Sequence, residues 1–139
     1  INRSPTDKRF PFMLKAIESI KNLHALDTAH GRAMLKDMVI DDAGNISFID
    51  LAEDPLSLMN IQEAKARDWL MFLFSALPFC SASEQKELVP LVKNSMDALT
   101  LKTFEQTIER IKKFKGLLPD LSKWGGKDGA RAAILLRLL

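Results

Sequence analysis

Residues 29–55 read AHGRAMLKDMVIDDAGNISFIDLAEDP, and this stretch sets the fold expected for the chain. Two short β-forming runs, MVI and ISFI, flank DDAGN, whose residues tolerate tight turns, so the pattern predicts a β-hairpin. His-Gly-Arg precedes the first strand at positions 30–32, Asp37 opens that strand, and Asp50 closes the second. Because a hairpin places its two ends side by side, the carboxylates of Asp37 and Asp50 are expected to converge on one point.

Around this hairpin the sequence predicts helices, so the expected fold class is mainly α with one β-hairpin. Residues 10–26 carry apolar side chains at helical spacing. Residues 61–77 combine good helix formers with an almost wholly apolar second half, which predicts a helix buried nearly all round and ended by Pro78. The hairpin is expected to pack on this helix, which contains Trp69.

Three later segments are also predicted to be helical. Residues 81–99 form the first, with Ser83 as the N-cap and Pro90 marking either a kink or a break into two shorter helices. Residues 101–118 form the second, which Gly116 is expected to stop. The segment WGGKDG, residues 124–129, is predicted to be a flexible connector, and residues 130–139 a terminal helix that needs a partner surface.

The bulk composition excludes several classes of protein. The 139 residues, 47% hydrophobic and 27% charged, suit one globular domain. A net charge of +2 gives no general case for nucleic-acid or membrane binding, and the basic residues between positions 110 and 115 are interpreted as a solvated helix face. The single Cys80 excludes an internal disulfide and favours a reducing, cytoplasmic location. No run reaches the roughly 18 apolar residues of a membrane span.

Four motifs follow one another within residues 10–77. The first predicted helix ends in LH at positions 23–24, the loop reads HGRAMLKD at 30–37, the hairpin closes with FIDL at 48–51, and the buried helix carries KARDW at 65–69. Together they resemble the C-terminal lobe of the protein-kinase-like superfamily. The resemblance is closest to the compact branch of RIO-type, aminoglycoside-phosphotransferase-type and lipopolysaccharide-kinase-type enzymes.

The resemblance implies an ATP- and Mg²⁺-dependent phosphotransferase, with a nucleotide and an unidentified phosphate acceptor as partners. Asp50 stands where the family has its metal-holding Asp, and Asp37 where it has a second metal ligand, an Asn. Both residues are therefore the expected cofactor-binding and metal-binding positions. His30 is expected to pack behind the loop and bond backbone, and Asp68 to be buried and to accept backbone N–H bonds from the loop.

The chain departs from the family at two places. Arg32 replaces the Asp that serves as catalytic base, and an arginine cannot accept a proton, although it can hold a phosphate or a carboxylate. The expected catalytic residues are therefore Arg32, contacting phosphate or substrate, and Asp37, which takes over as base or binds metal. Leu51-Ala52 replaces the usual Phe-Gly or Phe-Glu, and the short link to the next helix leaves no room for a long activation segment.

The family's nucleotide-binding front is not recognisable in the sequence. None of the six glycines forms the Gly-rich loop that covers ATP phosphates. Residues 1–139 are therefore interpreted as a single kinase-like C-terminal lobe, in a fold that is α+β overall if an N-terminal lobe exists. The initial Ile favours a processed product or a fragment of a longer protein. Exposed apolar surface is expected where an N-terminal lobe or partner subunit would sit.

Two further readings stay open at this stage. The first is a catalytically impaired, pseudokinase-like binding or regulatory module, which Arg32 and the missing front both favour. The second is a helical regulatory domain without any nucleotide site.

Overall fold

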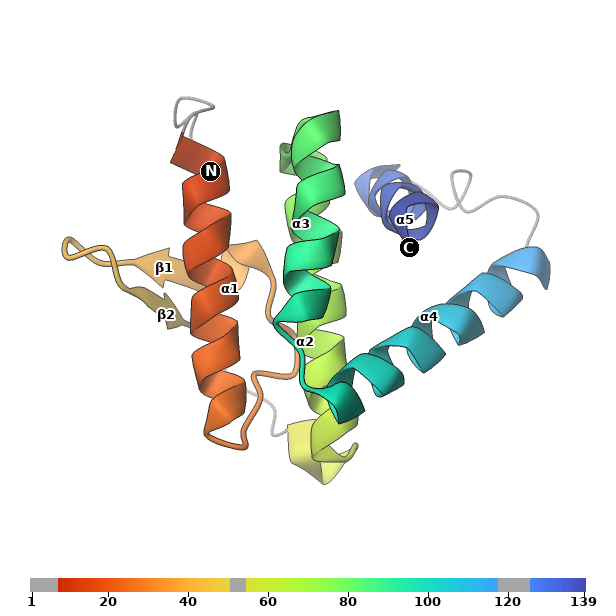
Figure 1. Cartoon of the computed structure of the whole chain (residues 1–139), viewed down its shortest axis with the longest axis horizontal. Helices are drawn as coiled ribbons and strands as arrows, with labels where there is room; N and C mark the ends of the chain where they lie inside the picture. The colour runs from red at the N-terminus through yellow and green to blue at the C-terminus, as the bar shows by residue number, and fades with distance from the viewer. Residues whose placement is uncertain (1–7, 51–54, 118–125) are drawn as a thin grey trace.

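The computed structural model of the chain describes residues 8–50, 55–117 and 126–139 (Figure 1). These residues form five α-helices, three short 3₁₀ helices and one two-stranded antiparallel hairpin, which confirms the predicted class of mainly α with one hairpin. In chain order the elements are α1 Arg9–Ala25, η2 Leu35–Asp37, β1 Met38–Ile40, β2 Ile46–Phe48, η3 Pro55–Ser57, α2 Ile61–Ala76, η4 Leu77–Phe79, α3 Ala82–Asn94, α4 Ala98–Leu117 and α5 Gly126–Leu138.

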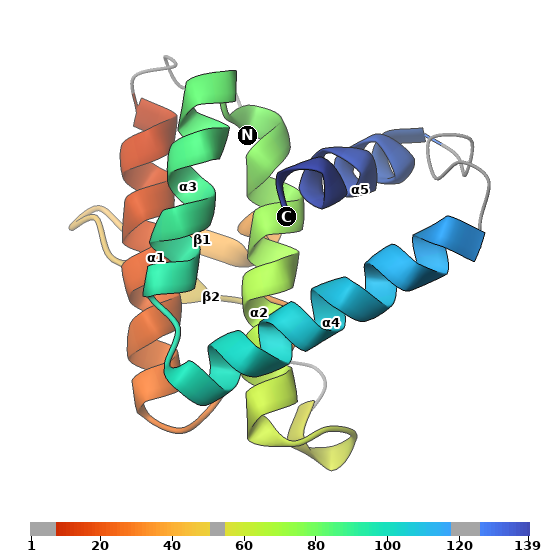
Figure 2. The same ribbon diagram turned by 45° about the vertical axis from the view of Figure 1, so that its right-hand side comes forward.

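Helix α2 is the central element of the fold. It contacts α1, α4 and α5 together with the turns η2, η3 and η4. Figures 1 and 2 show α1, α2 and α3 side by side along a common axis, with α2 antiparallel to α1 and α3, the hairpin on one side of them and α4 and α5 on the other. The residues that position the predicted site therefore belong to α1, α2 and the hairpin.

The burial of α2 explains its central place. Trp69, Phe72 and Leu73 are 0% exposed and lie in one core cluster with side chains from all the other helices. Its start is fixed by a capping box, in which the Asn60 side chain accepts from the Glu63 backbone and the Glu63 carboxylate accepts from the Asn60 backbone. The predicted helix, buried nearly all round, is confirmed.

The hairpin has a register set by its turn. Met38 pairs with Phe48, Val39 with Ser47 and Ile40 with Ile46. In the turn, Gly44 adopts φ +86°, a backbone conformation that glycine reaches without steric cost. The predicted hairpin is confirmed at residues 38–48.

The helix against which the strands mainly pack is α1, whereas packing on α2 was expected. The main helical contact of the strands is that of β2 with α1, and it is η2, immediately before β1, that packs against α2. The reason lies in side-chain alternation: Ile46 and Phe48 are partly buried against the core, and Ser47 between them is exposed. The hairpin and α2 therefore share one core, to which β1 contributes Met38, and the main contact with α2 is made by η2 while the strands pack mainly on α1.

Two predictions about α3 are corrected. Ser81, not Ser83, caps α3, because Ser81 has a glutamate three positions on that completes a capping box and Ser83 has Lys86 there. Helix α3 runs unbroken through Pro90, since Leu88 and Val92 on either side are buried in the core, so a break there is wrong.

The predicted ends of the last two helices also shift. Helix α4 includes Gly116 and ends at Leu117, one residue later than the expected stop. Helix α5 begins at Gly126, so residues 126–129 are helical and the prediction of a connector is wrong for them. Residues 124–125 of that connector lie outside the described residues.

The start of α4 gives a first testable prediction. The Asp97 carboxylate accepts from the backbone N of Thr100 at 2.8 Å and from its hydroxyl at 3.1 Å, and these bonds, the backbone one first, hold the pKa of Asp97 below its usual value. A lowered folded pKa means that the stabilisation is present above the unfolded value of about 3.9 and is lost as pH falls through the folded value. We expect Asp97→Ala to lower the free energy of unfolding by about 1 kcal/mol at pH 7, measured by urea denaturation.

The matched control is Glu105→Ala, at an exposed position inside α4. It is expected to change stability by less than about 0.5 kcal/mol. At pH 3 the loss caused by Asp97→Ala is expected to shrink, and an equal loss at pH 3 and pH 7 would contradict a charged cap.

Candidate functional site

One buried carboxylate on α2 holds the loop that precedes the hairpin. Asp68 is 0% exposed and accepts hydrogen bonds from the backbone N–H groups of His30 and Ala33, at 2.8 and 3.1 Å. It also accepts from Nε2 of His24, near the end of α1, at 3.0 Å. The burial and backbone bonding predicted for Asp68 are confirmed. Since these donors come from α1 and from the loop, Asp68 ties both segments to α2.

His30 is engaged on both ring nitrogens. Its Nε2 lies 2.9 Å from the carbonyl oxygen of Ile49, and its Nδ1 lies 3.3 Å from the backbone N of Arg32. Because a carbonyl can only accept and a backbone N–H can only donate, the ring carries its proton on Nε2 and accepts at Nδ1. Neither nitrogen is left for a substrate, which confirms the predicted structural role of His30.

Two further bonds fix the backbone around Asp37. The backbone N–H of Leu35 donates to the Ser75 hydroxyl of α2 at 3.0 Å. The backbone N–H of Ile49 donates to the carbonyl oxygen of Asp37 at 2.8 Å, which extends the pairing of the hairpin by one step beyond Met38 and Phe48. Asp37 therefore lies opposite the residue just before Asp50.

The three predicted site residues come together at this open end of the hairpin. The guanidinium of Arg32 reaches both carboxylates: its Nη2 lies 3.3 Å from Oδ2 of Asp50, and its Nε lies 3.9 Å from Oδ2 of Asp37. Both carboxylates thus lie beside one cation, which in this structure is the guanidinium of Arg32, and the shared divalent ion expected from the sequence stays a prediction. With two formal negative charges against one positive, the cluster keeps an excess negative charge.

The three side chains differ strongly in exposure. The side chain of Asp37 is 6% exposed, against 45% for Arg32 and 53% for Asp50. Oδ2 of Asp37 is buried and has no hydrogen-bond partner, since the contact with Arg32 is too long for one. A buried acceptor without a donor is uncommon in native proteins, and this one lies beside the guanidinium of Arg32.

The backbone at Asp50 is itself unusual. Its φ of +62° lies in the left-handed region, which non-glycine residues seldom adopt, although Asp and Asn tolerate it better than others. Such conformations are costly by about 1–3 kcal/mol and persist at functional sites where the surroundings fix them. Here the fixing contact is the bond from His30 to the carbonyl of the preceding Ile49.

The donor set fits the metal that the family resemblance implies. Among the described residues, no group of three or more His, Cys, Asp or Glu side chains gathers that could hold a metal ion, and the cluster at the hairpin end offers the two carboxylates of Asp37 and Asp50. Mg²⁺ is commonly held by one or two carboxylates, with water and substrate phosphates completing its shell. Oδ2 of Asp37, buried and without a donor, is the atom that a cation would satisfy.

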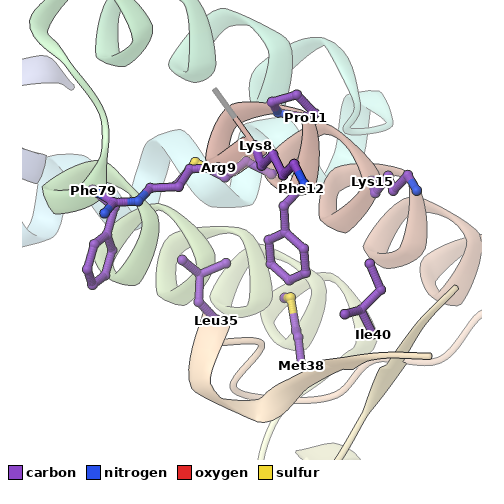
Figure 3. A pocket seen from close by; sticks show the side chains of 10 residues that line it. Lys8, Arg9, Pro11, Phe12, Lys15, Leu35, Met38, Ile40 and Phe79 are labelled. Carbon is purple, nitrogen blue, oxygen red and sulfur yellow. The ribbon is translucent and has the colours of Figure 1, made fainter. Parts of the chain in front are cut away.

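A groove of about 450 Å³ lies beside β1, outside the carboxylate cluster (Figure 3). In the close-up, Phe12 of α1 points down toward Met38, and Leu35, Ile40 and Phe79 complete an apolar floor, with Lys8, Arg9 and Lys15 on the α1 side. Arg32, Asp37 and Asp50 do not line it. The groove is therefore separate from the site formed by the three predicted residues.

Cys80 has the properties of a packed thiol. It is partly buried, its sulfur lies 3.3 Å from that of Met13, and burial, helped by the charge of Glu84, raises its pKa to about 11. At neutral pH the side chain is then a thiol and not a thiolate, and only the thiolate is a strong nucleophile. Cys80 is thus unsuited to covalent catalysis.

Two residues of the network were not assigned a role from the sequence. His24 was placed only as the end of a motif, yet it is 8% exposed and bonded to Asp68, with its ring edge-on to Trp69 at 5.5 Å. Its position in the last turn of α1, shortly before the loop, was the sequence feature that could have indicated this contact. Ser75 gave none, because a serine in an apolar helix has no visible partner in the sequence. The predicted replacement at Leu51-Ala52 lies outside the described residues.

No protein-family model, curated protein or solved structure matches the chain. Among the helices that the structure describes, none has the length and apolar character needed to cross a membrane.

The hydrogen bonds of Asp68 generate the second prediction. Asp68→Asn keeps the size of the side chain but replaces one acceptor oxygen with an NH₂ group, which then faces a donor. We expect this variant to lower the free energy of unfolding by about 3 kcal/mol, because buried donors lose their acceptor. Asp42→Asn, at an exposed position of the hairpin turn, is the matched control and is expected to cost less than about 0.5 kcal/mol in the same urea titration. Equal losses in the two variants would rule out a structural role for the network.

Proposed function

We propose that this chain is a kinase-like C-terminal lobe that binds a nucleotide through Mg²⁺ and takes part in phosphoryl transfer to an acceptor not yet identified. The observation that carries the proposal is the convergence of Arg32, Asp37 and Asp50 at one end of a hairpin. Phosphoryl transfer depends mainly on positioning and on neutralising phosphate charge, and this cluster offers groups for both.

Each residue has a separate role in the proposed site. Asp50, exposed at the end of the hairpin, and Asp37, buried beside it, would hold Mg²⁺, which when bound neutralises charge on the phosphates. Arg32 carries donors suited to a phosphate and is exposed enough to reach one. Because Arg32 cannot accept a proton, Asp37 either shares the metal with Asp50 or receives the proton of the acceptor hydroxyl in place of the missing base.

Exposed apolar side chains on the hairpin favour the binding of a nucleotide base next to the carboxylates. Val39, Ile40 and Ile49 are 44%, 50% and 46% exposed, so apolar side chains lie uncovered on the same hairpin as Asp50. A purine base and a covering lobe or partner subunit both bury apolar surface of this kind. We propose that the base lies over Val39 and Ile49, which the strand register places on the same face of the hairpin, and that an N-terminal lobe or partner subunit covers it.

The second candidate function is a pseudokinase-like module that binds a nucleotide or regulates a partner without transferring phosphate. The observation that favours it is the contact of Arg32 with both carboxylates, which places a cation and no proton acceptor at the base position. The two candidates share one site and differ in turnover.

The third prediction separates these candidates in the intact protein that carries this chain. Calorimetric titration with ATP is expected to show binding that depends on Mg²⁺, and Asp50→Asn is expected to weaken that binding at least about tenfold. Asparagine suits the substitution because it tolerates the left-handed backbone of Asp50. Asp42→Asn is the control and should bind as the wild type does.

Turnover of ATP is then measured in the same three proteins. Turnover in the wild type that Asp50→Asn abolishes supports the phosphotransferase. Mg²⁺-dependent binding without any turnover supports the binding module. The absence of ATP binding in every protein would exclude both and leave a helical regulatory domain without a nucleotide site.

A further inference from the structure

We infer that Arg32 is an internal counter-ion that occupies the cation position between Asp37 and Asp50 and must leave it for a divalent metal to bind. The inference rests on the proposed metal site and adds a way in which the chain itself regulates metal binding there. The site then has two states, one closed by the guanidinium and one in which a metal ion has replaced it.

The position of the guanidinium supports the first state. One nitrogen of Arg32 contacts Asp50 at 3.3 Å and another faces Asp37 at 3.9 Å, so the planar group lies across both carboxylates. Two neighbouring carboxylates repel each other unless a positive charge lies between them. Arg32 supplies that charge from within the chain.

The lengths of these contacts support the second state. Strong bonds between a guanidinium and a carboxylate measure about 2.7–2.9 Å, and both contacts of Arg32 are longer. Oδ2 of Asp37 is buried, faces Arg32 and still has no hydrogen-bond partner, so the arginine leaves the best shielded acceptor unsatisfied. With 45% of its side chain exposed, Arg32 has solvent to move into.

Displacement of Arg32 has a consequence for anion binding. In the closed state the guanidinium is engaged by carboxylates, and in the metal-bound state its donors are free for a phosphate group. Metal and phosphate are then expected to bind cooperatively, because the metal removes the carboxylates from competition for Arg32.

The fourth prediction is tested with Mn²⁺ alone, titrated into the intact protein without nucleotide and followed by electron paramagnetic resonance. Arg32→Gln is expected to bind Mn²⁺ about tenfold more tightly than the wild type, because the competing cation is gone. Lys36→Gln is the matched control: it removes one positive charge at an exposed position next to Asp37, and it is expected to change the affinity less than about twofold. Circular dichroism checks that each variant is folded.

Two more variants keep the test decisive. Arg32→Lys keeps the charge and loses the planar fork, so its Mn²⁺ affinity should lie between those of the wild type and Arg32→Gln. The double variant Arg32→Gln/Asp50→Asn should lose the tighter binding. Equal or weaker Mn²⁺ binding by Arg32→Gln, an equal gain in Lys36→Gln, or a gain that survives Asp50→Asn would each overturn the inference. Because no nucleotide is present, these results are independent of whether the protein binds or turns over ATP.

Discussion

The hydrogen bonds accepted by the Asp68 carboxylate connect the helical body of this protein to its candidate site. A carboxylate that is fully removed from water is tolerated only when donors replace its hydration, and here the donors are His24 on α1 and the backbone of His30 and Ala33. The same bonds that satisfy the charge also fix the path of the loop. His30 then continues the connection to Ile49 at the end of the hairpin. The geometry of the exposed residues is thus determined by a residue that none of them touches.

The carboxylates at the end of the hairpin differ from the buried carboxylate of Asp68 in how fully their hydrogen bonds are satisfied. Asp68 accepts three hydrogen bonds, from the His24 ring and from the backbone of His30 and Ala33. Asp37 and Asp50 share one arginine through long contacts, and one buried oxygen keeps no hydrogen bond. Selection for stability alone would favour a hydrogen-bond donor to this unpaired oxygen of Asp37.

Most of the framework was accessible from the sequence, because it depends on local patterns. The hairpin followed from two β-forming runs around DDAGN, and α2 from its apolar second half.

The errors in the predicted structure arose where the outcome depends on competing local choices or on partners distant in the sequence. Ser81 and Ser83 are chemically identical, and only the glutamate three positions on distinguishes the cap. The packing of β2 on α1 and the bond of Ser75 to Leu35 join residues far apart in the chain, and no periodicity encodes them. The convergence of Asp37 and Asp50 could be predicted because a hairpin makes distant residues neighbours. Their shared contact with Arg32 could not be predicted, because it depends on the three-dimensional path of the loop that carries Arg32.

The left-handed backbone at Asp50 limits how this position can change over evolutionary time. Asparagine and glycine fit such a backbone with little strain, whereas β-branched and bulky residues do not. Change at this position would therefore run first through residues that preserve the backbone and discard only the charge. The end of the hairpin would then keep its shape after losing its carboxylate.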